Sequence, residues 1–589
     1  MTTRQARVRA PELTGRGGWL NTGGQALTLQ DFRGSFLLLD FWTFCCVNCL
    51  HVLDELRPLE ERFRDLLTVV GVHSPKFAHE AEHVNVIAAV ERYQVHHPVL
   101  DDPDLSTWKQ YAVRAWPTLV LVDPEGYVVH VASGEGHGEG LGRLIEELAR
   151  EHEAKGTLHR GDGPYVPPPP AAGELAFPGK ALRLPDGTVL VSDSAHHSLV
   201  VLDGEQVTRR IGTGARGRAD GADPTFAEPQ GLALLEDGSV LVADTANHLL
   251  RRLDLVTGAV TTVAGTGRVW RPGDPTAGPA LEVNLSTPWD VAVWEGQVVV
   301  AMAGTHQLWV YDGTAVHVLA GTTGEGLRDG DASHAYLAQP SGLAAGSDRL
   351  WFADSETSSL RFLKDGEIGT SVGTGLFDFG HRDGPADQAL LQHPLGVTAL
   401  PDGSVAVSDT YNGALRRYDP MTDLVTTLAT GLAEPSDVVV DGEYLLVVES
   451  AAHRVTRLRL PDLARSVDGG AQRTLRPTSD LAPGSVTLTV VFTPAPGQRL
   501  DESYGPPTRV MVSASPPQLL LEGAGVSTDL TRRLVLGGDG GVLHVAAMAA
   551  SCDLDDEHAA CHVSQQDWGI PVRLVDGGDQ KLTLVLNGL

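Results

Sequence analysis

The sequence predicts a multidomain protein in which an α/β domain (residues 1–158), a six-bladed β-propeller (176–462) and a β-sandwich (483–589) follow one another. Three observations predict this fold class. Strand and helix patterns alternate in the first part, six similar segments repeat in the second, and short alternating strands fill the third. Links span residues 159–175 and 463–482. The chain of 589 residues needs several cores, because a single core stops growing near ~250–300 residues.

The first part alternates strands and helices in an order typical of a compact α/β domain. Apolar runs predict strands at LLLDFW, LTVVGVHS, PTLVLV and YVVHVA. Helical spacing of apolar residues predicts helices at CLHVLDELRPLEERFRD, EHVNVIAAVERYQV and LGRLIEELAREHEAKG. An Asp-Pro-Glu-Gly turn joins the last two strands. The link that follows contains four consecutive prolines, so we expect it to be extended and semi-rigid.

The second part is a repeat of one unit. Each unit has a proline entry, an apolar strand, a turn, a second strand, a polar corner and a third strand, and glycine-rich segments such as VTTVAGTGR supply a fourth. The entry prolines are spaced by 51, 59, 52, 54 and 41 residues, which suits four-stranded blades. They are Pro178, Pro229, Pro288, Pro340, Pro394 and Pro435.

The P-x-G entry, the D-G turn and the V-x-D-[ST]-x-x-[HN] corner resemble NHL repeats over residues 176–462. By our alignment Ala303 replaces the corner aspartate in the third repeat and Glu449 replaces it in the sixth. The corner aspartates are Asp193, Asp244, Asp354 and Asp409, and the aligned corner histidines and asparagines are His197, Asn247, His306, Asn412 and His453. Carboxylates that accept backbone N–H bonds in a tight turn explain the pattern, and a ring of metal ligands is the alternative.

The third part contains short strands such as TLTVVF and KLTLVL between glycine and proline turns, which predicts a β-sandwich. It also contains Cys552 and Cys561, separated by an acidic loop. A pair at this spacing can close a disulfide if the Cα atoms lie within ~7 Å, and two unpaired loop cysteines are the alternative.

The other three cysteines lie in FCCVNC, where Cys46 and Cys49 form a C-x-x-C between a buried strand and a helix. A thiol at a helix N-terminus is stabilised as a thiolate by the unpaired N–H groups, and a cysteine three residues on can resolve a mixed disulfide. A metal site would need further ligands, and His51 and His73 lack spacing partners. We expect Cys45 to be a small buried thiol.

Two further features accompany this motif. Asp40 ends the buried strand six residues before Cys46, where burial would raise its pKa and let it take the proton of the resolving cysteine. Trp116 and Pro117 precede the strand TLVLV, where a cis proline would suit a tight turn facing the cysteines.

Together these residues resemble the thioredoxin superfamily, and the V-D-P-E-G hairpin and the inserted helix at 82–95 resemble its TlpA-like branch. The resemblance implies that Cys46 is the nucleophile, Cys49 the resolving cysteine, Asp40 the buried acid and Pro117 the cis proline. Cys45 replaces the usual tryptophan before the nucleophile, and Val-Asn replaces the usual dipeptide, so the direction of the redox reaction stays open.

The order of the three parts and the C-C-[VI]-N-C motif resemble the NHL-repeat-containing protein 2 family over nearly the whole chain. The tail is similar to the Ig-like amino-terminal domain of DsbD-type reductases, whose cysteine pair exchanges electrons with a thioredoxin-like partner. That similarity implies a second redox pair, Cys552 and Cys561, which would need the tail to fold back onto the first domain.

The composition of the chain limits the kinds of molecule that we expect it to bind. The formal charge of −30 repels nucleic acid and anionic lipid, so neither is an expected partner. The amino terminus lacks an apolar signal core and no run of 18 apolar residues occurs, which predicts a cytoplasmic protein without membrane segments.

Three functions follow as hypotheses. The first is a thiol-disulfide oxidoreductase that needs no cofactor, is recycled by an external thiol reductant and recruits protein substrates through its propeller. The second is a redox-silent protein-binding scaffold. The third is a metal-dependent lyase or hydrolase in the propeller channel, for which no histidine spacing is specific.

Overall fold

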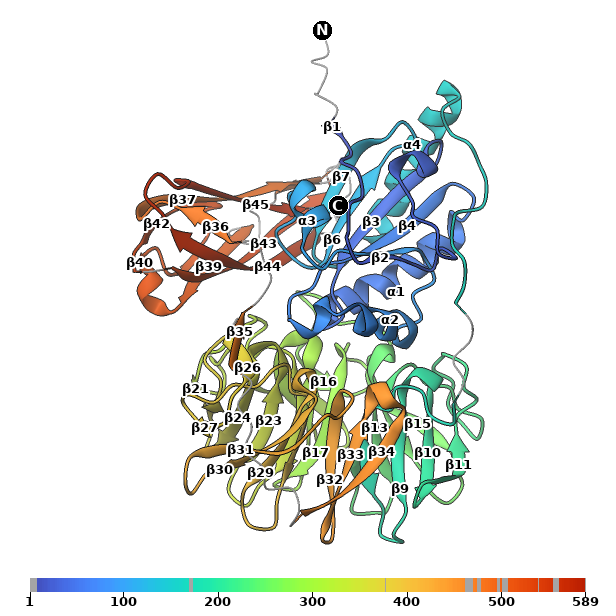
Figure 1. Ribbon diagram of the computed structural model, residues 1–589, viewed down its shortest axis with the longest axis vertical. Helices are drawn as coiled ribbons and strands as arrows, with labels where there is room; N and C mark the ends of the chain where they lie inside the picture. Colours follow the sequence, from blue (N-terminus) through green and yellow to red (C-terminus); the bar gives the residue numbers. More distant parts are fainter. Residues whose placement is uncertain are drawn as a thin grey trace. The chain divides into compact units, whose positions relative to one another are not determined.

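The computed structural model describes residues 8–168, 173–376, 378–460, 470–473, 478–494, 498–500, 507–538, 540–553 and 561–587. The chain forms two compact units. One contains the amino-terminal α/β domain and the C-terminal sheets, and the other contains a ring of sheets, drawn from green to orange in Figure 1.

The α/β domain is built on one seven-stranded sheet with the order β1-β7-β6-β3-β4-β5-β2. Its strands are β1 (Val8–Arg9), β2 (Gly18–Leu20), β3 (Phe36–Trp42), β4 (Leu67–His73), β5 (Val99–Asp101), β6 (Thr118–Val122) and β7 (Tyr127–Ser133). Its helices are α1 (Val47–Arg62), α2 (His83–Arg92), α3 (Ser106–Gln110) and α4 (Gly138–Lys155). The central strand β3 runs parallel to β4 and antiparallel to β6.

The apolar run of β3 places it at the centre of the sheet, and every residue of β3 and β4 is buried. On one face of the sheet Phe36, Leu38 and Val69 pack against α1 and α4 in a single core. Alternation along β3 puts Asp40 and Trp42 on the same face as Phe36 and Leu38. The sheet therefore holds a carboxyl group under the start of α1.

In the described part of the chain the ring consists of six antiparallel sheets. One edge strand of each sheet contacts the corresponding strand of the next sheet in cyclic order, β8, β12, β17, β22, β28, β32 and back to β8, and we call these six the inner strands. The first three sheets contain β8 (Ala181–Arg183), β9 (Val189–Asp193), β10 (Ser198–Asp203), β11 (Gln206–Ile211); β12 (Pro229–Leu234), β13 (Val240–Asp244), β14 (Leu249–Leu253), β15 (Val260–Ala264); β16 (Ala277–Pro279), β17 (Pro288–Trp294), β18 (Gln297–Met302), β19 (Gln307–Tyr311), β20 (Ala315–Ala320).

The last three sheets contain β21 (Gly330–Asp331), β22 (Pro340–Ala345), β23 (Leu350–Asp354), β24 (Ser359–Lys364), β25 (Glu367–Val372); β27 (Gly384–Pro385), β28 (Gly396–Ala399), β29 (Val405–Asp409), β30 (Ala414–Asp419), β31 (Leu424–Thr430); β32 (Pro435–Asp441), β33 (Tyr444–Glu449), β34 (Arg454–Arg459). A separate pair is formed by β26 (Asp378–His381) and β35 (Gly470–Arg473). Strand β35 lies in the segment expected to be a plain link.

Each ring sheet has a polar corner between the second and third strands counted outward from its inner strand, and the structure corrects our alignment there. Met302, not Ala303, occupies the aspartate position of the third sheet, since Met302 pairs with the entry residue Pro288 as Asp244 pairs with Pro229. Our alignment also mixed two positions, because Asn247 and Asn412 precede the left-handed corner residue. The left-handed positions are His197, His248, His306, Ser358, Gly413 and His453.

Corner histidines connect neighbouring sheets. Nδ1 of His197, His248 and His306 each accepts a hydrogen bond from the backbone N–H just before the next entry proline, over 3.1–3.3 Å. His453 does the same with the N–H of Phe177 at 3.0 Å, so the last sheet is joined to the first. The histidines are therefore structural parts of the closed ring.

The corner aspartates are buried and structural, as the turn interpretation predicted. Asp244 accepts hydrogen bonds from Ala227 N–H at 2.8 Å and from the buried guanidinium of Arg251 at 2.7 Å. A second aspartate, Asp220, also binds Arg251 at 2.7 Å. The same Asp-Arg-Asp group recurs as Asp354-Arg361-Asp329 and Asp409-Arg416-Asp383. The carboxylates of these corner aspartates therefore bind backbone N–H groups and buried arginines of the ring itself.

The C-terminal part forms two sheets that share one buried core. Their strands are β36 (Ser479–Leu481), β37 (Gly484–Thr493), β38 (Gln498–Leu500), β39 (Thr508–Ser515), β40 (Leu520–Glu522), β41 (Gly525–Ser527), β42 (Thr531–Leu536), β43 (Gly541–Asp553), β44 (Cys561–Leu574) and β45 (Lys581–Asn587). Strand β36 begins inside residues 463–482, so this segment is not a simple link. Alternating apolar residues such as Val486 and Leu488 fill the core.

Candidate thiol site

The C-x-x-C motif lies where strand β3 turns into helix α1. Cys46 is the N-cap residue of α1, and its Sγ accepts a hydrogen bond from the Cys49 N–H at 3.4 Å. Cys46 is partly exposed, whereas Cys49 is completely buried. Burial, and next a hydrogen bond with Cys46, raise the pKa of the Cys49 thiol well above its usual value. One thiol therefore faces the surface and the other stays protonated beneath it.

Asp40 lies in β3 below this turn and is completely buried. Burial raises the pKa of its carboxyl group well above the usual value, and the charges of Glu60 and Glu55 raise it further. The negative charge of Asp40 is also one of the causes that raise the pKa of Cys49, which indicates that the two groups are close enough to interact. The interaction is one of charge, since neither carboxyl oxygen of Asp40 makes a hydrogen bond within the described part of the chain.

The Trp116–Pro117 peptide bond is cis. Trp116 Nε1–H donates a hydrogen bond to the carbonyl of Ser74 at 2.7 Å, and the Ser74 N–H donates to the carbonyl of Trp42 at 2.8 Å. Trp116 also packs against Trp108 with ring centroids 4.3 Å apart. The cis-proline loop is thus tied to the end of β3, the strand that leads into the cysteines.

Glu80 is a buried residue of this site that the sequence analysis missed. Its carboxylate accepts hydrogen bonds from the N–H groups of Cys45, Lys76 and Phe77, each at 2.9 Å. It joins the cysteine turn to the segment that follows β4. Glu80 is the first of two acidic residues in KFAHEAEH, but its partner Cys45 lies 35 residues earlier, and sequence spacing does not predict such a contact.

Cys45 is buried beside Cys46. Burial raises the pKa of the Cys45 thiol well above its usual value, and Glu80 adds to this effect through its charge and a hydrogen bond. Because the thiolate is the reactive form of cysteine, the raised pKa makes Cys45 an unreactive thiol near neutral pH. Of the three cysteines in this motif, Cys46 alone combines partial exposure with a helix N-terminus.

Cys552 and Cys561 lie outside this site in sequence. Their backbone positions pair directly across β43 and β44 at the end of that hairpin. Their side chains lie outside the described residues. Ala115, next to Trp116, is a member of the buried core of the C-terminal sheets, which belong to the same compact unit.

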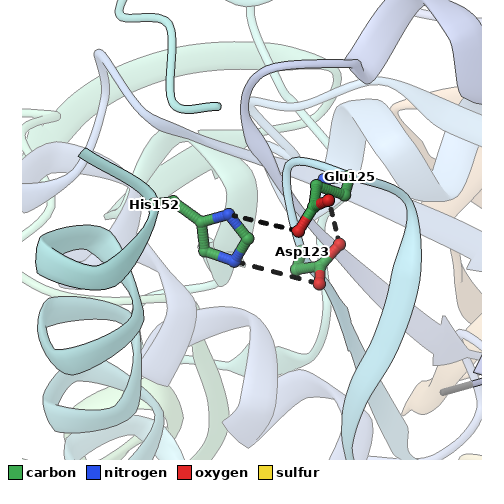
Figure 2. Close-up of side chains that lie close together, drawn as sticks. All are labelled: Asp123, Glu125 and His152. Carbon is green, nitrogen blue, oxygen red and sulfur yellow. Dashed lines mark hydrogen bonds and ion pairs between the residues drawn. The ribbon is translucent and has the colours of Figure 1, made fainter. Parts of the chain in front are cut away.

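Among the described residues, one group has the side chains and spacing to hold a metal ion, namely Asp123, Glu125 and His152 (Figure 2). Figure 2 shows the two His152 nitrogens facing different carboxylates, at 3.8 Å from Asp123 and 4.0 Å from Glu125. His152 Nδ1 also contacts Thr157 Oγ1 at 2.7 Å, and Asp123 accepts the N–H groups of the β6–β7 turn. These roles in a turn and a helix end account for the group.

Another buried charged group lies at the inner strands of the ring. Lys180 Nζ is 3.4 Å from Asp290 and 3.8 Å from Asp437, and it donates to the carbonyl of Leu395 at 2.6 Å. This ion pairing ties strands of different sheets together. It offers no specific support for a lyase or hydrolase site.

Comparison with known proteins defines the class. A family model described as thioredoxin-like matches residues 34–128, and a model of the NHL repeat matches residues 226–253 and 285–311. The protein therefore combines a thioredoxin-like domain with NHL repeats. No helix among the described residues is long and apolar enough to cross a membrane.

The chain belongs to the NHL repeat-containing protein 2 family. It is 36% identical over 501 residues to NHL repeat-containing protein 2 of Homo sapiens. The matched region covers 74% of this chain and 68% of the human protein. The chain is 37% identical over 477 residues to Protein SUPPRESSOR OF QUENCHING 1, chloroplastic, of Arabidopsis thaliana, covering 76% of this chain but only 45% of that protein. The chain thus spans less than half of the plant relative.

The thioredoxin-like domain is distantly related to thiol-disulfide oxidoreductases. It is 24% identical over 144 residues to Thiol-disulfide oxidoreductase YkuV of Bacillus subtilis, which covers 24% of this chain and 94% of that protein. The Cys46–Cys49 pair lies in this related domain.

Proposed function

We propose that the protein is a thiol-disulfide oxidoreductase that uses Cys46 and Cys49. The observation that carries the proposal is the asymmetry of the pair, with a partly exposed Cys46 at the helix N-terminus and a buried, protonated Cys49 in hydrogen-bond contact with it. The hydrogen bond from the Cys49 N–H fixes Cys46 Sγ at the N-terminus of α1, where a substrate disulfide can reach it.

In the reducing direction the Cys46 thiolate attacks one sulfur of a substrate disulfide and releases the other as a thiolate. Cys49 then transfers its proton to the Asp40 carboxylate and attacks Cys46 Sγ, which releases the second substrate thiolate. The substrate gains two electrons and the enzyme is left with a Cys46–Cys49 disulfide, which an external dithiol reduces. The reverse steps oxidise a substrate dithiol, and the reduction potential of the pair decides the direction.

The cis-proline loop of Trp116 and Pro117 is proposed to hold the substrate backbone beside Cys46. We interpret the ring as a six-bladed NHL propeller that recruits the protein substrate or partner, and the chemistry needs no cofactor. The alternative is a redox-silent scaffold in which the propeller binds a protein and the thiols do not cycle.

We extend the proposal to Cys552 and Cys561 as a second redox pair in an immunoglobulin-like sandwich. Support comes from their direct pairing across β43 and β44, since opposite residues of an antiparallel pair have Cα atoms ~4.5–5.5 Å apart, within disulfide reach. The grouping of the C-terminal sheets with the thioredoxin-like domain in one unit also supports it.

A redox titration with peptide-level alkylation tests these proposals. The full chain is equilibrated in glutathione or dithiothreitol buffers, and each cysteine is labelled with an alkylating mass tag. We expect Cys46 and Cys49 to oxidise together, and Cys49→Ser to accumulate mixed disulfides through Cys46. Cys45→Ser serves as the matched control and should leave the titration unchanged. Failure of the pair to oxidise reversibly would favour the scaffold.

A further inference from the structure

Three buried side chains near Cys49 carry polar atoms without a hydrogen-bond partner among the described residues. The side chains are Asp40, Trp42 and His97. The atoms without a partner are both carboxyl oxygens of Asp40, Nε1 of Trp42 and Nε2 of His97. Asp40 and Trp42 are 0% exposed and His97 is 4% exposed. Buried polar groups are nearly always paired, so a group of them next to a reactive thiol needs a physical explanation.

These atoms meet beside Gly71. Asp40 and Gly71 are register partners in the parallel strands β3 and β4, so the Asp40 carboxyl lies on the face where a Gly71 side chain would stand. A Cβ atom at Gly71 would lie 2.9 Å from Trp42 Nε1 and 3.2 Å from His97 Nε2. Both nitrogens therefore border the space that the glycine leaves next to Asp40.

His97 links this space to the surface. Its Nδ1 is 3.0 Å from Oε1 of Glu60, whose side chain is 23% exposed. An imidazole can take a proton on one nitrogen and release one from the other, because its two nitrogens exchange donor and acceptor roles. The arrangement has an inner end at Asp40 and an outer end at a carboxylate that reaches water.

We propose that His97 and Glu60 form a proton path between Asp40 and solvent. The inference deepens the proposed function, because Asp40 must release its proton before it can accept the one from Cys49. A proton leaves the Asp40 carboxyl through a water held by Trp42 Nε1–H and enters His97 Nε2. The Nδ1 proton passes to Glu60 and then to solvent. One proton enters and one leaves, and no electrons move. His97 and Glu60 act through Asp40 and are positioning residues.

The ionisable groups that face Asp40 limit the alternatives. Helix α1 contributes Cys49, Glu55 and Glu60, and the segment before β5 contributes His97. Gly71 and Leu119, the register partners in β4 and β6, do not ionise. His73 lies two residues farther along β4, and burial lowers its pKa to about 3, so it stays neutral.

Glu60 and Glu55 provide a matched pair of test sites. Both charges raise the pKa of Asp40, but only Glu60 contacts His97, whereas Glu55 accepts the Gly136 N–H at 2.8 Å. If charge alone matters, both Glu60→Gln and Glu55→Gln lower the pKa of Asp40 and speed the step that uses its carboxylate. If Glu60 is in the proton path, its variant must instead slow that step.

The experiment follows the reaction of the full chain with 5,5′-dithiobis(2-nitrobenzoic acid) by stopped flow. The first release of thionitrobenzoate reports attack by Cys46, and the second reports resolution by Cys49. We expect Glu60→Gln and His97→Gln to slow the second release about tenfold near pH 7 and leave the first unchanged. Glu55→Gln should speed the second release. His96→Gln, at the exposed neighbouring histidine, is the control for His97.

Each outcome has a separate meaning. If both releases occur but Glu60→Gln speeds the second as Glu55→Gln does, the proton path is wrong and the oxidoreductase function stands. If no second release occurs in the unaltered protein, the proposed function itself fails. Should His97→Gln lower the thermal unfolding temperature, the isosteric change at the partly exposed Glu60 still decides the question.

Discussion

Two regions of this molecule each bury aspartates completely, and they treat them differently. In the ring, Asp244 is paired with the buried Arg251, and burial raises its pKa only to about 6 because Arg251 opposes the effect of burial. In the thioredoxin-like domain, no cation is paired with Asp40 among the described residues, and its pKa is raised well above the usual value. The ring therefore uses the carboxylate as a fixed structural charge, whereas the thiol site keeps a carboxyl group that can gain and lose a proton.

The largest effect is expected from removing the cation in the ring. Arg251→Met leaves Asp244 buried without its partner, and breaking a buried ion pair costs about 3–5 kcal/mol. Urea unfolding of the full chain measures the loss. Arg252→Met is the control, since its partner Asp237 is half exposed and such surface pairs contribute about 0–1 kcal/mol. Equal losses in the two variants would contradict the comparison.

Asp40→Asn is expected to change stability in the opposite direction. Because burial raises the pKa of Asp40, the folded protein holds the carboxyl proton of Asp40 more tightly than the unfolded chain does. The free energy of unfolding therefore falls as the pH rises from the pKa of Asp40 in the unfolded chain to its pKa in the folded protein. At pH 8 the variant should be more stable by about 1–3 kcal/mol, since the unaltered protein must on folding either protonate Asp40 or bury its unpaired charge.

The gain in Asp40→Asn should disappear below about pH 4, where Asp40 is protonated in both the folded protein and the unfolded chain. Urea unfolding across pH measures it. The same variant should slow resolution by Cys49 by about 10²-fold, because the proton acceptor is lost. A stability gain that does not depend on pH would argue that Asp40 does not titrate.

A smaller effect is expected at the junction that closes the ring. His453→Gly keeps the left-handed backbone (φ 55°) but removes the acceptor of the Phe177 N–H, at a cost of about 1 kcal/mol. His453→Asn retains a polar acceptor and tolerates the left-handed conformation, so it should lose less. Equal unfolding midpoints for His453→Gly and the unaltered chain would show that this hydrogen bond is not needed.

The smallest effect is expected at Cys45. Its pKa is raised by burial and by Glu80, so it should stay a thiol and react with iodoacetamide far more slowly than Cys46 at pH 7. Cys45→Ala should change stability by less than about 1 kcal/mol and leave the redox titration of Cys46 and Cys49 unchanged. Rapid labelling of Cys45 would contradict the separation of the two thiols.

Local patterns in the sequence predicted the parts of the site that are close together in the chain. The strand, turn and helix around Cys46 and Cys49 are set by neighbouring residues, and the position of Asp40 follows from the same strand. Glu80 and His97 were missed because their contacts reach Cys45 and Gly71 from distant segments. The space that Gly71 leaves beside Asp40 cannot be predicted until the register of β3 and β4 is known.

The ring shows the same limit at another scale. The entry prolines revealed the repeat, but one residue of ambiguity at the corner was enough to align Ala303 in place of Met302. Hydrogen-bond register between strands resolved it. The two- and three-residue strands β1 and β2 carry too short a pattern to be recognised, and β35 and β36 form in a segment whose composition indicates a link.

The hydrogen bond between His453 and Phe177 also has a consequence for synthesis of the chain. The two residues are 276 positions apart, so at ~5–20 residues per second the ribosome needs roughly 14–55 seconds to supply the second after the first. During that interval the first sheet lacks its neighbour on one side. The C-terminal sheets, whose core includes Ala115, emerge later still. The thiol site is therefore synthesised well before either compact unit is complete.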